Sequence, residues 1–225
     1  MPESPHKALP ETAATVFVVD DDETVRKALA RLVRSAGMTA RTFPTAEAFL
    51  AESHAVPASC LVLDVRLPGL NGLQLQEALH RKGYPIAIVF ITGHGDVPTS
   101  VRAMKAGAVD FLQKPFTGPE LLDAVRRAVG RTRDAVAKQA ETAEIQRRYD
   151  TLTPREREVF SLVVTGLLNK QVAGELGAAE KTIKIHRGRV MAKMQAPSVA
   201  DLVRMAGLLG IPPHTPAPRG APRAS

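Results

Sequence analysis

One short segment, CLVLD at residues 60–64, strongly limits the folds that this chain can adopt. Four apolar residues lead directly to one carboxylate, and the turn signal Pro68-Gly69 follows soon after. A continuous apolar run of this length predicts a strand of a parallel sheet that is buried on both faces. The last residue of such a strand lies at the carboxyl edge of the sheet, where open α/β folds bind their ligands. We therefore expect Asp64 to be the reactive residue of the chain.

Apolar runs and amphipathic segments alternate regularly through the first 130 residues. The expected strands cover residues 15–19, 39–43, 60–64, 86–91 and 109–112, and the expected helices cover residues 23–36, 46–52, 71–82, 98–106 and 117–130. This alternation predicts an α/β fold, a doubly wound five-stranded parallel sheet with helices on both faces. Parallel strands end at one edge of their sheet, so four strand ends should meet there. These ends carry Asp20 and Asp21, Asp64, Thr92, and Lys114.

The three carboxylates at this edge repel one another unless a cation lies among them. Oxygen ligands with open coordination positions suit Mg²⁺ (or Mn²⁺). A cation and a lysine together make one carboxylate a competent nucleophile toward phosphorus, and they neutralise charge on a transferred phosphoryl group. Thr92 can hydrogen-bond a phosphoryl oxygen and Lys114 can pair with another. Because there is no glycine-rich nucleotide cradle, the site should accept a phosphoryl group from a donor without binding ATP itself.

Four motifs, VVDDDETVR, LVLDVRLPGLNG, VFITGHGD and AGAVDFLQKPF, occur in this order along residues 18–116. In sequence and spacing they resemble the receiver domains of two-component response regulators. The resemblance implies the flavodoxin-like fold of the chemotaxis receivers, with Asp64 as the phospho-acceptor. It further implies a Mg²⁺ site made by Asp20, Asp21, Asp64 and the main-chain carbonyl of Arg66.

The same resemblance assigns the residues that sense the phosphoryl group. Thr92 and Phe111 resemble the switch pair, and Lys114 resembles the phosphate-sensing lysine, with a cis peptide bond to Pro115. Many receivers have tyrosine at the position of Phe111, and phenylalanine lacks the hydroxyl, so only burial of its ring can report the state. The GHGDV segment at 93–97 and this phenylalanine resemble the FixJ-like branch of the family.

Composition divides the rest of the chain. Residues 131–150 are rich in Ala, Arg, Gln and Glu and poor in apolar bulk, which predicts an exposed helical linker. Thr153, Pro154 and Glu156 form a capping box with proline at the first helical position, which predicts the start of a new domain of four helices. The expected organisation is a phospho-acceptor domain over 15–130, a linker over 131–150, an all-α domain over 151–210, and disordered ends at 1–14 and 212–225.

Positive charge is concentrated in the last third of the chain. The net charge is +7, and residues 151–225 carry 11 lysines and arginines against 5 acidic residues, whereas residues 1–130 carry 14 of each. This asymmetry is typical of a nucleic-acid binder. Residues 169–177 should form a supporting helix, and residues 180–194 a basic recognition helix.

The segments LTPREREV and NKQVAGELGAAEKTIKIHRGRVMAKM resemble the LuxR-type helix-turn-helix. The resemblance implies contacts to DNA by Thr182 and Lys184, with His186 near the backbone. The full set of expected DNA-binding residues is Lys181, Thr182, Lys184, Ile185, His186, Arg187, Arg189 and Lys193. Gly188 departs from the family pattern, because several members carry a basic residue there. The apolar stripe of the last helix, residues 198–209, should leave a strip for dimer contact.

These expectations combine into a transcription regulator. A sensor histidine kinase would phosphorylate Asp64, and this would promote homodimerisation, release of the DNA-binding domain, or both. Double-stranded promoter DNA is the expected target, and RNA polymerase is a further candidate partner. Two rivals are a constitutive DNA-binding regulator with a vestigial receiver and a metal-dependent aspartyl-phosphate phosphohydrolase. The second usually needs an acid two residues after its nucleophile, where this chain has Arg66, so we expect no enzyme.

The compartment is inferred from what the sequence lacks. The single cysteine, Cys60, excludes a disulfide framework, and no apolar run reaches the length of a membrane span. Residues 1–14 are acidic and broken by proline, without the apolar core of a signal peptide. We therefore expect a cytoplasmic protein that does not bind membranes.

Overall fold

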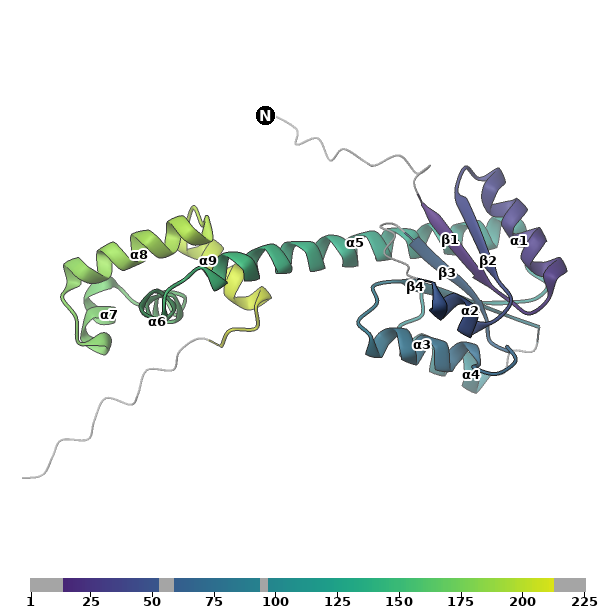
Figure 1. Cartoon of the computed structure of the whole chain (residues 1–225), viewed down its shortest axis with the longest axis horizontal. Helices are drawn as coiled ribbons and strands as arrows, with labels where there is room; N and C mark the ends of the chain where they lie inside the picture. Colours follow the sequence, from purple (N-terminus) through teal and green to yellow (C-terminus); the bar gives the residue numbers. More distant parts are fainter. Residues whose placement is uncertain (1–13, 53–58, 94–96, 213–225) are drawn as a thin grey trace, which may run out of the picture. The chain divides into compact units, whose positions relative to one another are not determined.

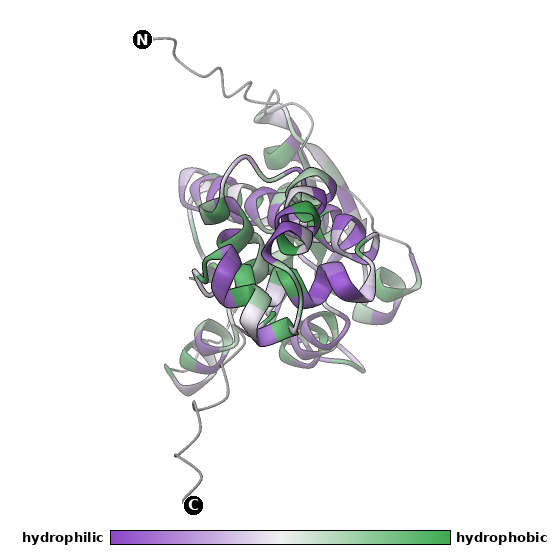
Figure 2. Cartoon of the chain, turned by 90° about the vertical axis from the view of Figure 1, so that its left-hand side faces the viewer, coloured by the Kyte–Doolittle hydropathy of each residue, from purple (hydrophilic) through white to green (hydrophobic). Residues whose placement is uncertain are grey.

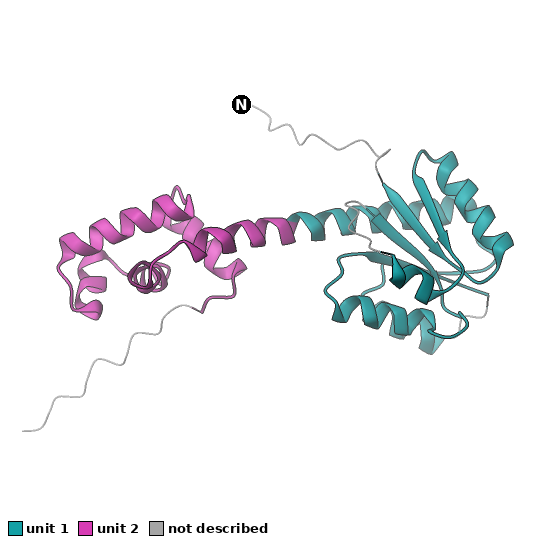
Figure 3. Ribbon diagram, in the orientation of Figure 1, with its two compact units in different colours: residues 1–137 teal, residues 138–225 magenta. Residues whose placement is uncertain are grey.

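The computed structural model describes residues 14–52, 59–93 and 97–212. It divides into two compact units, residues 1–137 and 138–225 (Figure 3). The expected disordered ends lie outside the described residues except for Ala14 and Pro212, as do residues 94–96 of the GHGD motif.

The first unit is a five-stranded parallel sheet with helices on both faces (Figure 1). Its elements are β1 (Thr15–Val19), α1 (Glu23–Ser35), β2 (Thr39–Phe43), α2 (Ala46–Ala51), β3 (Ser59–Asp64), α3 (Gly72–Arg81), β4 (Ala87–Thr92), α4 (Val97–Lys105), β5 (Asp110–Gln113) and α5 (Gly118–Asp150). The strand order is β2-β1-β3-β4-β5, and every neighbouring pair is parallel. The predicted α/β fold is therefore confirmed. Apart from α5, the bounds of these elements differ from the expected ones by at most one residue at either end.

Side chains alternate along each strand and so build one apolar layer on each face of the sheet. Val16 and Cys60 belong to the layer covered by α1 and α5. Phe17 and Leu61 belong to the layer covered by α2, α3 and α4. β1, β3 and most of β4 are buried on both faces, as their continuous apolar runs predicted. An apolar layer must therefore cover each face of the sheet. Burial raises the pKa of the Cys60 thiol, so this group is an unreactive part of the core.

The helices begin where the sequence supplies side-chain caps. Asp22 accepts hydrogen bonds from the main-chain N–H groups at the start of α1. Thr45 caps α2, and Asn71 forms a capping box with Gln74 at the start of α3. Each cap satisfies N–H groups that have no partner within the helix. These caps fix the points at which the chain leaves the carboxyl edge of the sheet.

α5 is a single helix of 33 residues and does not end near Gly130. Its buried stripe on the sheet runs from Leu121 to Ala128 and ends at Thr132, which is 2% exposed. The hydroxyl of Thr132 accepts a hydrogen bond of 2.8 Å from the N–H of Ala87, the first residue of β4. The following two turns are largely exposed, as their composition predicted.

The second unit packs short helices around its own apolar core. It contains the end of α5 and the helices α6 (Pro154–Val163), α7 (Asn169–Leu176), α8 (Glu180–Met194) and α9 (Val199–Leu208). The core is built by fully buried side chains, among them Val159, Phe160, Ile183, Val190 and Leu202. In Figure 2 these helices show both apolar (green) and polar (purple) residues, as expected for half-buried helices. Within the described part of the chain, no helix is long and apolar enough to cross a membrane.

Candidate functional site

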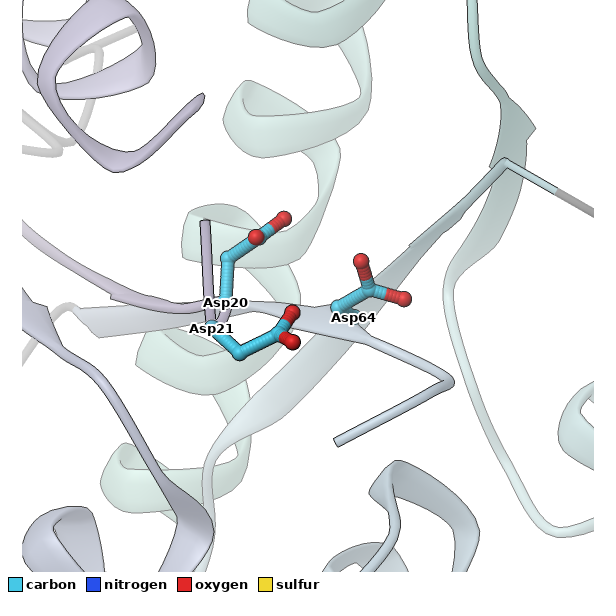
Figure 4. A group of neighbouring side chains, drawn as sticks. All are labelled: Asp20, Asp21 and Asp64. Atoms are coloured by element: carbon cyan, nitrogen blue, oxygen red, sulfur yellow. The ribbon is translucent and has the colours of Figure 1, made fainter. Parts of the chain in front are cut away.

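Three carboxylates lie together at the carboxyl edge of the sheet (Figure 4). Asp20 and Asp21 follow β1, and Asp64 ends the neighbouring strand β3. One oxygen of each lies within 4.8 Å of the others. Asp20 is completely buried and Asp64 is 7% exposed, whereas Asp21 is exposed to solvent. The cluster is therefore held rigidly on one side and is accessible on the other.

Lys114 joins two members of this cluster. Its ammonium group donates hydrogen bonds of 2.7 Å to one carboxylate oxygen of Asp20 and to one of Asp64. The main-chain N–H of Lys114 donates to the carbonyl of Thr92, which aligns the end of β5 with β4. The peptide bond between Lys114 and Pro115 is cis. The structure thus brings together the residues that the strand ends were predicted to supply.

Burial and charge act in opposite directions on these groups. Burial raises the pKa of the Asp20 carboxyl, and the hydrogen bond from Lys114 offsets only part of this rise. Burial alone would lower the pKa of the Lys114 ammonium, but its hydrogen bonds to Asp20 and Asp64 leave that pKa raised. One lysine therefore does not fully compensate the acidic cluster. Buried and exposed carboxylate oxygens with an open side fit the ligand set of Mg²⁺.

Sequence patterns did not reveal two contacts that support this edge. The guanidinium of Arg26, on α1, donates a hydrogen bond of 2.6 Å to the carbonyl of Asp20. The carboxylate of Glu47, on α2, accepts a hydrogen bond of 2.9 Å from the N–H of Leu70 in the loop after β3. Both side chains lie in the first turns of helices that begin at this edge. That position is the only signal that could have marked them in the sequence.

Gly72 is a further residue that the sequence did not single out. The N–H of Gly72 donates to the carbonyl of Val65, and the residue packs against the main chain of Asp64. A Cβ atom added at Gly72 would lie 2.4 Å from the carbonyl oxygen of Asp64, well inside any normal contact distance. Only glycine therefore allows α3 to start so close to the end of β3.

We expect Gly72→Ala to destabilise the first unit by about 2 kcal/mol, because overpacking shifts the main chain at Asp64. Urea unfolding of the full chain measures this effect. Gly130→Ala is the matched control, because a Cβ there meets no atom within 4 Å and alanine favours the helix. Equal unfolding midpoints for Gly72→Ala and the unaltered chain would contradict the expectation.

The expected switch residues occupy neighbouring strands. Thr92 is the last residue of β4 and is completely buried. Phe111, on β5, pairs in register with Phe90 and is half-buried, with 6.3 Å between the two ring centroids. Asp64 itself is oriented by a hydrogen bond of 2.9 Å from the N–H of Arg66. Thr92 and Phe111 thus lie on adjacent strands. Thr92 follows Ile91, the register partner of Asp64, and β5, which carries Phe111, is in contact with α4.

α7 and α8 form the two helices of a helix-turn-helix. Gly177 adopts a left-handed conformation, with φ of +59°, and turns the chain between them. Arg187 of α8 donates a hydrogen bond of 3.0 Å to Asn169 at the start of α7. The bounds of both helices agree with those expected from the sequence.

The basic residues of α8 differ in exposure. Lys181, Thr182, Lys184 and Arg189 are exposed, and the side chain of Ile185 is also 49% exposed. Ile183, Val190 and Met194 are buried on the opposite face. His186 and Arg187 are half-buried, and Nδ1 of His186 is buried without a hydrogen-bond partner among the described residues. The exposed face of α8 is therefore basic, with one apolar side chain at its centre.

Lys193 has a different environment from the other basic residues. Its ammonium donates a hydrogen bond of 2.6 Å to the carboxylate of Glu156 and one of 3.0 Å to the carbonyl of Thr151. Glu156 is 2% exposed and also completes the capping box of α6 with Thr153. The hydrogen bond from Lys193 lowers the pKa of the Glu156 carboxyl. Helix periodicity placed Lys193 on the basic face, but it could not show this tertiary ion pair.

Glu156→Gln should destabilise the second unit by about 2 kcal/mol at pH 7, because it removes a charged hydrogen-bond partner of Lys193. The folded-state pKa of Glu156 is lowered, so its contribution is present above the ordinary carboxyl pKa of about 4.3 and is lost as pH falls through the folded value. The difference between variant and parent should therefore shrink below about pH 4.3. Urea unfolding across this pH range tests this, with the exposed Glu175→Gln as control. A difference that stays constant with pH would exclude the ion pair as its cause.

Each half of the chain matches a known protein family. The family model described as "Response regulator receiver domain" matches residues 16–126, and "Bacterial regulatory proteins, luxR family" matches residues 150–206. Nodulation protein W of Bradyrhizobium diazoefficiens is 54% identical over 200 residues, which cover 89% of this chain and 88% of the relative. The transcriptional regulatory protein FixJ of Rhizobium meliloti is 45% identical over 195 residues, which cover 87% and 96%.

Solved structures lead to the same result. The response regulator StyR is 46% identical, with a TM-score of 0.74, and the match covers 87% of this chain and 98% of StyR. Full-length FixJ from B. japonicum is 40% identical, with a TM-score of 0.51, and the match covers 88% and 97%. Proteins of this kind are regulators and not enzymes. The chain therefore belongs to the two-component response regulators, in the FixJ-like branch that joins a receiver to a LuxR-type DNA-binding domain.

Proposed function

We propose that phosphorylation of Asp64 controls DNA binding by this regulator. The proposal rests on the position of the Lys114 ammonium group, which lies 2.7 Å from a carboxylate oxygen of Asp20 and 2.7 Å from one of Asp64. A lysine in this position holds the acceptor carboxylate and neutralises charge on an incoming phosphoryl group. Membership of the family implies a kinase partner and a DNA target.

The proposed reaction is a phosphoryl transfer from a phosphohistidine of a sensor kinase. A carboxylate oxygen of Asp64 attacks phosphorus, the new oxygen–phosphorus bond forms, and the phosphorus–nitrogen bond breaks. The imidazole leaves with the electron pair of the broken bond, and it exchanges protons with solvent. Mg²⁺, held by Asp20, Asp21, Asp64 and the main-chain carbonyl of Arg66, would supply positive charge to the phosphoryl oxygens.

The proposed switch follows from the new charge at Asp64. Lys114 pairs with one phosphoryl oxygen, and the hydroxyl of Thr92 turns to hydrogen-bond another. This movement leaves space beside β4 into which the half-buried ring of Phe111 moves. Because β5 and α4 are adjacent, the surface that they form changes with the state of Asp64.

α4 supports a proposal of homodimerisation on activation. Val97, Val101 and Met104 are 75%, 43% and 44% exposed. Their spacing of four and three residues places them on one face of the helix. An apolar stripe of this kind is suited to association with a second copy, and two copies would bind half-sites spaced about 10 bp apart.

α8 is proposed to enter the major groove of double-stranded DNA. Thr182 and Lys184 would contact base edges, and the exposed Ile185 would contact a thymine methyl group. Lys181, Arg187 and Arg189 would contact phosphates, with His186 near the backbone. Gly188 offers no side chain, so the base opposite it would be read less strictly.

Footprinting across genomic promoter fragments tests the proposed function. We expect protected paired half-sites whose half-saturating protein concentration falls at least tenfold when acetyl phosphate and Mg²⁺ are added. Identical protection with and without the donor, despite phosphoryl uptake, would instead support a constitutive DNA-binding regulator. The reporter activity of bound promoters then distinguishes activation from repression.

A further inference from the structure

α4 buries little of its surface in the receiver. Of its nine residues, Ala103 alone is buried. Val97, Val101 and Met104 are exposed, and so are the basic residues of its last turn. The residue of α4 that enters the core of the receiver, Ala103, therefore lies near the carboxyl end of the helix.

The carboxyl end of α4 is bound by a buried amide side chain on α3. Gln76 is 4% exposed, and its Nε2 donates hydrogen bonds of 3.2 Å to the carbonyl of Ala103 and 3.3 Å to the carbonyl of Ala106. The reversed amide would place an oxygen against two carbonyl oxygens, so this orientation is the one that the contacts allow. The same side chain lines an open cleft of about 440 Å³ between the ends of α3 and α4. Gln76 therefore joins α3 to the carboxyl end of α4.

Two properties of Gln76 indicate a specific role. Its Oε1 atom is buried and has no hydrogen-bond partner among the described residues, so the amide is used as a donor only. Gln76 also lies four residues after Gly72, on the same face of α3. Gly72 packs against the main chain of Asp64, so one turn of rigid helix connects the phospho-acceptor to the end of α4.

We propose that Gln76 is a positioning residue that anchors the carboxyl end of α4 and makes this end the pivot of the activated receiver. Phosphorylation moves the amino-terminal part of α4 with Thr92, while the turn at Ala103–Ala106 remains bound to Gln76. The proposal rests on the proposed function in one respect, because it requires that α4 changes when Asp64 is phosphorylated. The anchor itself is present in the unphosphorylated protein.

Hydrogen exchange of the full chain, with and without acetyl phosphate and Mg²⁺, tests the pivot without any substitution. We expect exchange at Val101 and Arg102 to change at least tenfold on phosphorylation. Exchange of the N–H groups of residues 106–108, which close the anchored end, should change less than twofold. Equal changes at both ends would overturn the pivot.

Gln76→Met tests the anchor, because methionine keeps the length of the side chain and removes the donor. We expect exchange at residues 103–108 to rise at least tenfold in the unphosphorylated variant. The initial rate of phosphoryl uptake should stay within twofold of the parent, since Gln76 does not touch the acidic cluster. Glu77→Gln, the adjacent exposed position, is the matched control and should leave both quantities unchanged.

The outcomes separate the anchor from the proposed function. Unchanged exchange in Gln76→Met overturns the anchor, whatever phosphorylation does. If Gln76→Met does not fold, as judged by circular dichroism, the measurement on the unaltered chain still decides whether the end of α4 is a pivot. If phosphorylation changes neither α4 nor DNA affinity, the proposed function fails, while the exchange of Gln76→Met still reports on the anchor.

Discussion

Asp64→Asn abolishes Mg²⁺-dependent phosphoryl uptake and the rise in DNA affinity that a phosphoryl donor produces; this is the largest effect that we expect from any single substitution. Asparagine preserves the shape of the side chain, but its amide is not a nucleophile toward phosphorus and carries no charge to hold the cation. Lys114 and Asp20 remain in place, so the fold at the edge of the sheet should persist.

Two measurements check this result. Uptake of labelled phosphate from acetyl phosphate should fall by at least 100-fold, and the ratio of DNA dissociation constants without and with donor should fall to 1. Asp123→Asn, an exposed carboxylate on α5, is the matched control and should behave like the parent. A donor that still raises the DNA affinity of Asp64→Asn would show that the signal enters elsewhere.

The residues at the carboxyl edge of the sheet could be predicted because topology alone brings them together. Asp20, Asp64 and Thr92 each lie at or beside the end of an apolar run, and parallel strands align such ends whatever their separation in sequence. Lys114 follows the same rule. The caps at Thr153 and Glu156 were likewise predictable, because a capping box is a local pattern of four residues.

The remaining contacts depend on tertiary packing and have no local pattern. Gly72 is required because of the carbonyl of Asp64, and Gln76 is bound to carbonyls 27 and 30 residues away. Arg26 and Lys193 have the periodicity of exposed basic residues, yet both donate hydrogen bonds within their own domains. The change of composition at Gly130 does not mark the end of a helix, because α5 continues and packs on the sheet as far as Thr132.

Lys184→Ala should weaken binding of the activated protein to its site by at least tenfold and relax its preference among bases at one position of each half-site. Lys184 is exposed on α8, off the face that buries Ile183 and Val190, so its loss leaves the core intact. A contact between lysine and a guanine edge is worth about 1–3 kcal/mol of discrimination.

Lys181→Ala should instead weaken binding to all DNA sequences equally and lower the salt slope by about 1, as expected for a phosphate contact.

Lys193→Ala separates contact with DNA from stability of the domain. Its ammonium is bound to Glu156 and to the carbonyl of Thr151, so alanine leaves a buried carboxylate without its cationic partner. We expect a lower urea midpoint for the second unit, whereas the DNA dissociation constant of the folded protein and its salt slope remain those of the parent. Fluorescence anisotropy with matched and scrambled half-sites measures the DNA dissociation constant and its salt slope. Lys138→Ala, on the exposed part of α5, controls for the loss of one positive charge. A salt slope reduced by about 1 in Lys193→Ala would instead show that this lysine contacts DNA.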